Sequence, residues 1–430
     1  MDQAPLDPAV ISQALAPFGH SLGLPTGAYR SPAVFGWEVE QFFSGTWFCL
    51  GRVDDLVEPG QLRGVRVGSE SVLLARDGDQ VRAFSNVCRH RGHELAPVGD
   101  AFDARLVRCP YHAWTYRFDG SLKTAPSFSG VSDFDESDYP LITVPAGTWG
   151  GWLFVNLDGT APPLVEQIGN LTRVLAPYEP GGLAVGHRQD YEVQANWKVI
   201  VENFNECYHC TAIHPSLCEV TPIGSGADLT PTGLWCGGTM DLKPHAATMS
   251  MDGSTPLQPL PGVTGELLRQ VVYVTLFPNL LISAHPDYVL THRLEPLGPS
   301  RTRIECAWLF PPETTNDAAF DPAYAVDFWD LTNHEDWAVC EGVQRGMANS
   351  GHRPGPLSSW EATVYQFLTM VGRAYLGSGL TPSPVENRSS SHPRSGGDAL
   401  RRQPMTAEEA LRERPGPTQL LTSSIAGTRR

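Results

Sequence analysis

The stretches Cys88-Arg89-His90-Arg91-Gly92-His93 and Cys109-Pro110-Tyr111-His112-Ala113-Trp114 decide the fold of the amino-terminal half of this chain. Each stretch offers one Cys and one His at close spacing, so together they supply two thiolates and two imidazoles. This ligand set fits a [2Fe–2S] cluster in which two Cys hold one iron and two His hold the other. The predicted ligands are therefore Cys88, His90, Cys109 and His112, and the predicted role is one-electron transfer.

A structural zinc site is the main alternative for these four ligands. Two Cys and two His can also close a tetrahedral zinc site. Zinc ligands usually come as a Cys pair followed by a His pair, whereas each half of this set mixes one Cys with one His. The mixed order favours the iron–sulfur cluster over zinc.

The residues around the ligands resemble a known family. Arg91-Gly92 follows the first pair, and Tyr111 and Trp114 accompany the second. These stretches resemble the C-x-H-R-G and C-P-Y-H-x-W motifs of the Rieske domain of ring-hydroxylating and related oxygenases. Rieske proteins of respiratory complexes carry an extra Cys in each loop, but His93 and Tyr111 or Ala113 stand at those places here. The resemblance is therefore to the low-potential, oxygenase-type branch.

Length and charge limit the class of protein. At 430 residues the chain is long enough for two domains, and its 41% hydrophobic and 18% charged residues are typical of globular proteins. The net charge of −16 argues against a nucleic-acid partner, because phosphate binding needs clustered Lys and Arg. An acidic surface either attracts a basic electron-transfer partner or only keeps the protein in solution. Because neither a secretory signal nor a membrane-spanning run is visible, we expect a cytoplasmic protein without a membrane partner.

The amino-terminal half is predicted to form a small all-β domain. Short alternating segments separated by turn signals predict strands at 61–67, 70–75, 81–86 and 150–156. Both ligand motifs fall at turns between these strands, where backbone N–H groups can point at the cluster sulfurs. We expect a Rieske domain over 42–160, preceded by a helical segment over 1–41 that packs on the second, catalytic domain.

The second half mixes helices with strands. Helices are predicted at 165–175, from Asn196-Trp197-Lys198 onward through His209, and at 323–347. Strands are predicted at 186–195, 270–277, 280–285, 288–294 and 302–310. The fold class is therefore α+β, with a catalytic domain over 161–380 in which an antiparallel sheet is wrapped against helices. The stretch 381–430 is rich in Ser, Pro, Arg and Gly, so it predicts a disordered tail.

A pair of histidines, His209 and His214, indicates a second metal site. On an ideal helix an offset of five residues turns two side chains roughly 140° apart, so both face one metal only where the helix is bulged or ends. Pro215, a helix-ending residue, follows at once. Such pairs are common without metal, but a Rieske cluster needs an electron acceptor.

The run from Asn196-Trp197-Lys198 to Pro215 resembles the mononuclear iron motif of Rieske oxygenase α-subunits. The resemblance implies His209 and His214 as ligands of non-haem Fe(II), and two imidazoles with one carboxylate leave open positions for O₂. In the family the carboxylate ligand precedes an E-x-x-Q-x-G stretch, which 341–346 matches, so we expect Asp336 to be that ligand. Glu335 and Glu341 are the alternatives, and a solvated acidic helix face is the remaining interpretation.

Glu206 has a different implied role. By the same resemblance, an acidic residue three before the first iron-binding His is not a ligand but bridges that His, here His209, to a cluster His of the neighbouring subunit, here His112. Most family members have Asp at this place, and the Glu occurs in the branch resembling choline, carnitine and glycine betaine oxygenases. The two metal sites of one chain would lie far apart, so the electron would have to pass between subunits. This implies a cyclic homo-oligomer, and we expect a trimer.

The resemblance also implies the reaction. Electrons from NAD(P)H would pass through a separate flavin or iron–sulfur reductase to the cluster and then to Fe(II), where O₂ is used to oxidise a small molecule. No dinucleotide-binding GxGxxG fingerprint is visible, so the reductase is expected to be another polypeptide. The alternative is not an oxygenase but an electron-transfer Rieske protein with a degenerate second domain. The number of iron atoms per chain distinguishes the oxygenase from this carrier.

The substrate is the least determined feature. A quaternary ammonium needs aromatic faces, and the aromatic residues that we expect near the iron are Phe204, Tyr208, Trp235, Tyr273 and Phe277. Aromatic residues in an enzyme also pack in the core, which is the competing interpretation. We expect monooxygenation and N-demethylation of a compound such as glycine betaine; hydroxylation or demethylation of an aromatic compound, by mono- or dioxygenation, is the alternative.

Overall fold

The structure is a computed structural model that describes residues 1–381 of the chain. The tail that we predicted to be disordered, 381–430, lies outside the described residues except for its first residue. No helix within 1–381 combines the length and the apolar character needed to cross a membrane.

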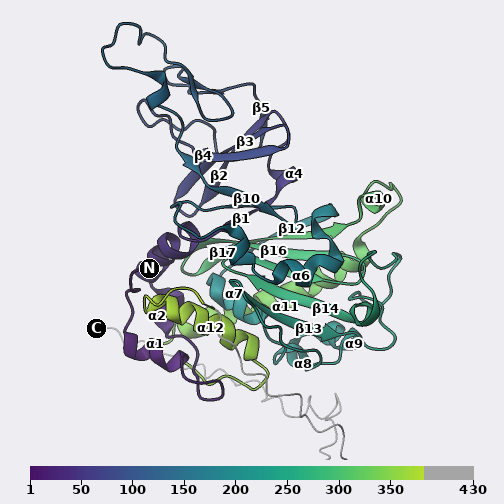
Figure 1. Cartoon of the computed structure of the whole chain (residues 1–430). Helices are drawn as coiled ribbons and strands as arrows, with labels where there is room; N and C mark the ends of the chain where they lie inside the picture. The colour runs from purple at the N-terminus through teal and green to yellow at the C-terminus, as the bar shows by residue number, and fades with distance from the viewer. Residues whose placement is uncertain (382–430) are drawn as a thin grey trace, which may run out of the picture. The chain divides into compact units, whose positions relative to one another are not determined.

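The cluster-bearing part is built of three small antiparallel sheets (Figure 1). The largest has the strand order β5-β2-β3-β4-β9, and the other two have the orders β1-β11-β10 and β6-β7-β8. Their bounds are β1 Phe48–Arg52, β2 Gln61–Val67, β3 Glu70–Asp77, β4 Gln80–Ser85, β5 Phe102–Asp103, β6 Val107–Arg108, β7 Thr115–Tyr116, β8 Leu122–Thr124, β9 Thr143–Val144, β10 Ala146–Trp149 and β11 Trp152–Val155.

Two-residue turns join the central strands of the largest sheet. Gly68 opens the turn between β2 and β3 with φ +57°, and Gly78 opens the turn between β3 and β4 with φ +58°. A side chain disfavours this left-handed conformation, so glycine at the first position sets a hairpin turn that matches the twist of the strands. The alternating sequence of β2, β3 and β4 then buries one face over the core that holds Cys88 and Cys109.

The second part is organised around a six-stranded antiparallel sheet with the order β12-β17-β16-β15-β14-β13. The bounds are β12 Ala184–Val193, β13 Trp235–Asp241, β14 Gln270–Leu276, β15 Leu280–Ala284, β16 Val289–Gly298 and β17 Arg301–Phe310. Both faces are apolar: along β17, Ile304 and Trp308 belong to one hydrophobic cluster, whereas Leu309 belongs to another. Side chains alternate between faces along a strand, so helices must cover the sheet on both sides.

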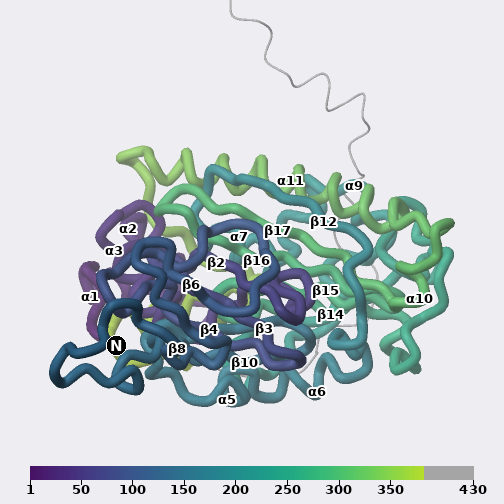
Figure 2. The backbone as a smooth tube through the Cα atoms, turned by 90° about the horizontal axis from the view of Figure 1, so that it is seen from above, coloured from purple at the N-terminus to yellow at the C-terminus, as the bar shows by residue number. Residues whose placement is uncertain are grey.

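Helices supply those two covers. α5 (Leu164–Ile168) and α6 (Leu171–Leu175) pack on the face that contains Leu309. α7 (Trp197–Phe204), α11 (Ala323–Met347) and α12 (Ala362–Tyr375) contribute to the cluster on the opposite face. The amino-terminal helices α1 (Pro8–Ala14), α2 (Thr26–Arg30) and α3 (Pro32–Glu38) lie together in Figure 2, and α1 and α2 lie beside α12 in Figure 1. Trp37 of α3 packs on Tyr375 of α12 with ring centroids 5.4 Å apart.

A buried polar network ties the amino-terminal helices to α7. The Lys198 ammonium donates to Glu38 over 2.6 Å, and both side chains are fully buried. The same carboxylate accepts from the Trp197 indole at 2.9 Å and from the Tyr375 hydroxyl. A buried charge is tolerated only when it is paired and hydrogen-bonded, so this network fixes where α7 begins.

The cluster-bearing part is also joined to the second sheet by hydrogen bonds. The Asn279 amide donates to the Cys49 carbonyl and accepts from the Cys49 N–H, both at 2.9 Å. Gln167 makes a similar pair of contacts with the backbone of Trp47, at 3.0 and 2.9 Å. These contacts hold β1 against the edge of the catalytic part.

The predicted α+β class, with its all-β part and its antiparallel sheet, is confirmed. β2 and α11 have the predicted bounds. Two helices are different. The helix that we expected over 165–175 is divided into α5 and α6 at Gly169, whose left-handed backbone has φ +54°. The helix that we expected to continue through His209 ends at Phe204. β13 and α12 were not predicted, and the domain limits at 41, 160 and 380 stay predictions.

Candidate active site

The two cluster motifs form matching loops. In each loop the N–H of the residue four after the Cys donates to the Cys carbonyl, from Gly92 to Cys88 and from Ala113 to Cys109, both at 3.1 Å. Gly92 and Ala113 both adopt a left-handed backbone, with φ +73° and +59°. The N–H of each Cys closes its loop on the carbonyl five residues further on, at 2.8 Å. Cys88 and Cys109 therefore stand at equivalent places in two copies of one turn.

The side chains of these loops fit an iron–sulfur cluster. Both thiols are buried, and burial raises the pKa of the Cys109 thiol. The imidazoles of His90 and His112 lie with their ring centroids 4.7 Å apart. The Nδ1 atom of His90 is buried and has no hydrogen-bond partner, and coordination of a metal through its lone pair would satisfy this nitrogen. The Tyr116 hydroxyl lies 3.3 Å from the Cys88 sulfur, where it can tune a cluster.

His112 lies at the outer edge of this region. Its side chain is exposed, and the ring of its neighbour Tyr111, 52% exposed, lies with its centroid 3.7 Å away. His90 is instead covered by the stacked ring of Trp114 at 5.0 Å. Of the two histidines, His112 is therefore the one that another protein surface can approach.

The chain between α7 and the next helices is shaped by Glu206. Its carboxylate accepts the backbone N–H of Tyr208 and, at 3.1 Å, that of His209. A side chain that takes these donors replaces the helical hydrogen bonds, which is why α7 does not continue. His209 instead precedes the short helix α8 (Cys210–Ile213), and His214 stands between α8 and α9 (Pro215–Val220). The break satisfies the geometric condition that two His five residues apart can face one point.

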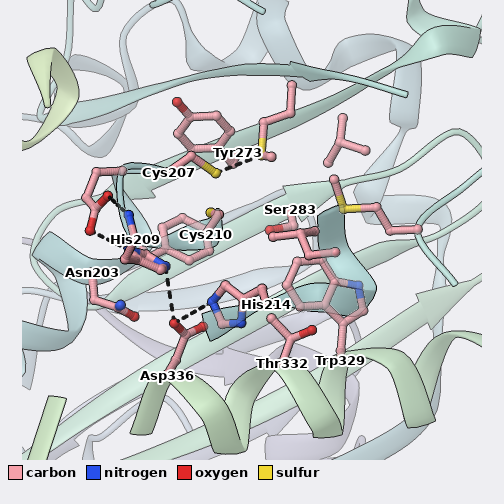
Figure 3. A pocket seen from close by; sticks show the side chains of 16 residues that line it. Asn203, Cys207, His209, Cys210, His214, Tyr273, Ser283, Trp329, Thr332 and Asp336 are labelled. Atoms are coloured by element: carbon pink, nitrogen blue, oxygen red, sulfur yellow. Dashed lines mark hydrogen bonds and ion pairs between the residues drawn. The ribbon is translucent and has the colours of Figure 1, made fainter. Parts of the chain in front are cut away.

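The structure brings His209, His214 and Asp336 together (Figure 3). One ligand atom from each of them lies within 4.8 Å of the other two. Oδ1 of Asp336 lies 3.0 Å from Nε2 of His214 and 3.4 Å from Nε2 of His209. Two imidazoles and one carboxylate that converge in this way match the ligand set of non-haem iron oxygenases.

A second carboxylate contacts each histidine from behind. Glu206 bonds to Nδ1 of His209, and Glu335 bonds to Nδ1 of His214 at 2.8 Å. Burial lowers the pKa of His209, but the bonds to Asp336 and Glu206 outweigh it and raise the pKa to about 10. Burial raises the pKa of Asp336, but its hydrogen bonds to both histidines outweigh this and lower it. The site therefore favours cations.

The two alternative carboxylate ligands lie elsewhere. Glu335 contacts only the far nitrogen of His214 among the site histidines. Glu341 accepts the N–H of Gln194 at 3.0 Å and lines a separate surface hollow with Trp337. Neither is placed as Asp336 is, between the two imidazoles.

A cavity of about 70 Å³ opens beside the three converging groups. A single water needs roughly 10–15 Å³, so the cavity has room for a small organic molecule. Its lining residues are Asn203, Phe204, Glu206, Cys207, His209, Cys210, His214, Leu217, Met240, Met249, Val271, Tyr273, Ser283, Trp329, Thr332 and Asp336. Within residues 1–381, no Lys or Arg lines this cavity.

Two of the five aromatic residues that we expected here, Phe204 and Tyr273, line the cavity. The other three do not. Trp235 is fully buried against the α5–α6 side of the sheet, and Phe277 packs on Phe42 with ring centroids 5.0 Å apart. Tyr208 is 61% exposed and is not among the residues that line the cavity. Sequence order around the histidines did not reveal on which face of each element these rings lie.

The aromatic residue that we missed is Trp329. It lies seven residues before Asp336 on α11, and Thr332 lies between them, so all three occupy one face of the helix (Figure 3). The Trp329 indole N–H donates to the Tyr288 hydroxyl at 2.8 Å, which holds the ring in place. Counting back along α11 from Asp336 in steps of three and four residues would have found it.

The fold and the site define a class: an α-subunit that joins a Rieske domain to a mononuclear iron domain. Residues 46–135 match the Rieske [2Fe-2S] domain, and residues 180–377 match the catalytic domain of the ring hydroxylating alpha subunit. The chain belongs to the Rieske non-haem iron oxygenase family, and it is an oxidoreductase whose cofactors are a Rieske cluster and mononuclear iron. Our predictions of family, enzyme class and cofactors are confirmed.

Its relatives act on quaternary ammonium compounds. The chain is 31% identical over 394 residues to the glycine betaine monooxygenase oxygenase subunit of Chromohalobacter salexigens, covering 81% of this chain and 86% of that protein. It is 35% identical over 336 residues to the carnitine monooxygenase oxygenase subunit of Escherichia coli K12, covering 77% and 85%. Both are oxygenase subunits, and an oxygenase component is what we predicted.

Solved structures show the same fold. The quaternary ammonium Rieske monooxygenase CntA with its substrate L-carnitine has a TM-score of 0.69 at 24% identity, covering 87% of this chain and 100% of that one. Naphthalene 1,2-dioxygenase from Rhodococcus sp. with bound indole has a TM-score of 0.67 at 20% identity, covering 86% and 98%. The shared fold therefore accommodates both substrate classes considered from the sequence.

Proposed function

We propose that this chain is the oxygenase component of a system that oxidises a methylated ammonium compound, with N-demethylation as the outcome. His209, His214 and Asp336 would hold the mononuclear iron, and Cys88, His90, Cys109 and His112 would hold the cluster. When bound, the iron supplies the activation of O₂. The protein residues position the substrate, keep bulk water out and hold the ligand imidazoles in one orientation.

The residues that line the cavity are the observation that supports this proposal. Phe204, Tyr273 and Trp329 offer aromatic faces, and Met240 and Met249 add polarisable sulfur. Among residues 1–381, no Lys or Arg lines the cavity, so neither an ammonium nor a guanidinium group of the protein faces the substrate there. The carboxylates of Glu206 and Asp336 add a negative field. Such a wall suits an ammonium group, because aromatic faces and carboxylates both attract a cation.

A product assay tests the substrate class. The protein, loaded with cluster and iron, would be supplied with electrons by a generic reductase and offered glycine betaine, carnitine, stachydrine or benzoate. We expect formaldehyde together with the amine that has lost one methyl group, in equal amounts. Oxidation of benzoate alone would refute the ammonium proposal and favour an aromatic substrate.

Iron content tests the two-site assignment. An oxygenase holds about three irons per chain, two in the cluster and one in the mononuclear site, whereas an electron carrier holds about two. We expect His209→Ala to keep the cluster absorption and to lose one iron together with turnover. Unchanged turnover in that variant would show that the mononuclear site lies elsewhere.

We also propose that the working unit is a homotrimer, reduced by a separate NAD(P)H-dependent flavin or iron–sulfur reductase. The exposed position of His112 and the exposed rings of Tyr208 and Trp360, 61% and 46% exposed, support a contact between subunits near Glu206. In solution, light scattering should give three chains per particle. A monomer with full turnover would contradict the trimer proposal.

A further inference from the structure

His214 is held from two sides by consecutive residues of α11. Glu335 Oε2 lies 2.8 Å from its Nδ1, and Asp336 Oδ1 lies 3.0 Å from its Nε2. Neighbouring residues on a helix point roughly 100° apart, so the two carboxylates can reach opposite edges of one ring. The imidazole is 1% exposed, which leaves it little freedom to turn.

The same arrangement is found at His209. Its Nδ1 bonds to Glu206, and its Nε2 faces Oδ1 of Asp336. In both rings a carboxylate stands at Nδ1, and the two Nε2 atoms converge on one oxygen. An ionised carboxylate only accepts hydrogen bonds, so Nδ1 must carry the proton. Nε2, which faces Asp336, is then the nitrogen that can give up its proton and bind a metal.

We propose that Glu335 is the positioning residue of the iron site, which fixes the tautomer and the orientation of His214 as Glu206 does for His209. This inference rests on the proposed function, which makes His214 an iron ligand. Glu206 is implied to bridge to another subunit as well, whereas the contact of Glu335 lies within its own chain.

Two physical consequences follow for the iron. A carboxylate at Nδ1 makes the imidazole a stronger donor through Nε2. Glu335 also brings the number of carboxylates around the two histidines to three, with Glu206 and Asp336, against the two positive charges of Fe(II). Removing the Glu335 charge should weaken iron binding and change the electronic environment of the iron without touching a ligand.

The test compares Glu335→Gln, which keeps the shape and removes the charge, with Glu341→Gln as the matched control. Glu341 lies on the same helix, away from the site histidines. Iron affinity would be measured in the full chain by competition with a chelator, with the cluster absorption as a check of folding. We expect the dissociation constant for Fe(II) to rise about 10- to 100-fold in Glu335→Gln and to stay unchanged in the control.

A spectroscopic measurement separates positioning from general destabilisation. The paramagnetic resonance spectrum of the iron with added nitric oxide should change in Glu335→Gln and not in Glu341→Gln. Should Glu335→Gln fail to fold, Glu335→Asp, which is one methylene shorter, serves in its place. An unchanged affinity and spectrum in the Glu335 variant overturn the inference. His214→Ala then shows whether the proposed function fails as well. Loss of iron in His214→Ala would leave the proposed function standing without the role of Glu335. Retention of iron in His214→Ala would show that the ligand assignment is wrong.

Discussion

Substituting Trp329 offers the sharpest test of how the cavity recognises its substrate. The ring lines the cavity and is fixed by its hydrogen bond to the Tyr288 hydroxyl, at 2.8 Å. Trp329→Leu removes the aromatic face but keeps an apolar side chain, whereas Trp329→Phe keeps a face. Both lose the indole N–H, so the pair is matched for the hydrogen bond.

The size of the effect follows from the surroundings of the ring. A cation over an aromatic face gains about 2 kcal/mol where both are removed from water, as in this cavity. That energy corresponds to a roughly 30-fold loss of affinity for the ammonium substrate in Trp329→Leu, since about 1.4 kcal/mol is tenfold. Trp329→Phe should lose much less affinity, because it keeps an aromatic face. The Tyr288 hydroxyl still donates to the Met249 carbonyl at 2.8 Å, so its place is kept.

The assay is calorimetric titration without O₂, with each substrate paired to an isostere in which an uncharged carbon replaces the quaternary nitrogen. The isostere reports the loss of packing alone, so the difference between the two ligands isolates the charge. We expect Trp329→Leu to weaken the ammonium compound far more than its isostere. Equal losses for both ligands would refute recognition through the aromatic face and leave only apolar packing.

Three further predictions concern the scaffold and the cluster. Lys198→Met should lower the free energy of unfolding by about 3–5 kcal/mol in urea titrations, because it leaves the buried Glu38 carboxylate unpaired; a double variant with Glu38→Gln that recovers none of this loss would contradict the pairing. Tyr116→Phe should lower the midpoint potential of the cluster by about 40 mV in a redox titration, since a bond of about 1 kcal/mol to the Cys88 sulfur is lost; an unchanged potential would exclude this contact. Burial raises the pKa of Glu202 from its usual value near 4.5 to about 7, so the folded chain holds this proton more tightly than the unfolded chain does. The stability that the protonated side chain contributes at low pH should therefore be lost as the pH rises from about 4.5 to about 7. Thermal melts across that range should show the loss in the native chain and not in Glu202→Gln.

Local sequence patterns determined much of the fold. The alternation of β2 and the uninterrupted helical stretch of α11 gave elements with the predicted bounds. The helix that begins at Trp197 was expected to run on because its apolar spacing continues, but the Glu206 carboxylate takes the N–H groups that another turn would need. α12 was missed although its polar residues Gln366, Thr369 and Arg373 recur at intervals of three and four residues, which is the helical spacing.

The difference between local spacing and long-range packing also separates what could be predicted of the site from what could not. The groups that we propose as iron ligands come from short motifs with fixed spacing, and the structure brings His209, His214 and Asp336 within reach of one another. The aromatic wall depends instead on which side chains of each strand or helix reach the cavity. Trp235 lies on the opposite face of the sheet, and Phe277 lies on the face covered by α7 and α11 but packs on Phe42 away from the cavity. Glu335 shows the limit most clearly. In the sequence it is a neighbour of Asp336 and a rival for the same role, and only the position of the His214 ring, brought in from far along the chain, separates a carboxylate facing Nε2 from one facing Nδ1. Long-range packing therefore assigns distinct roles to residues that the sequence leaves equivalent.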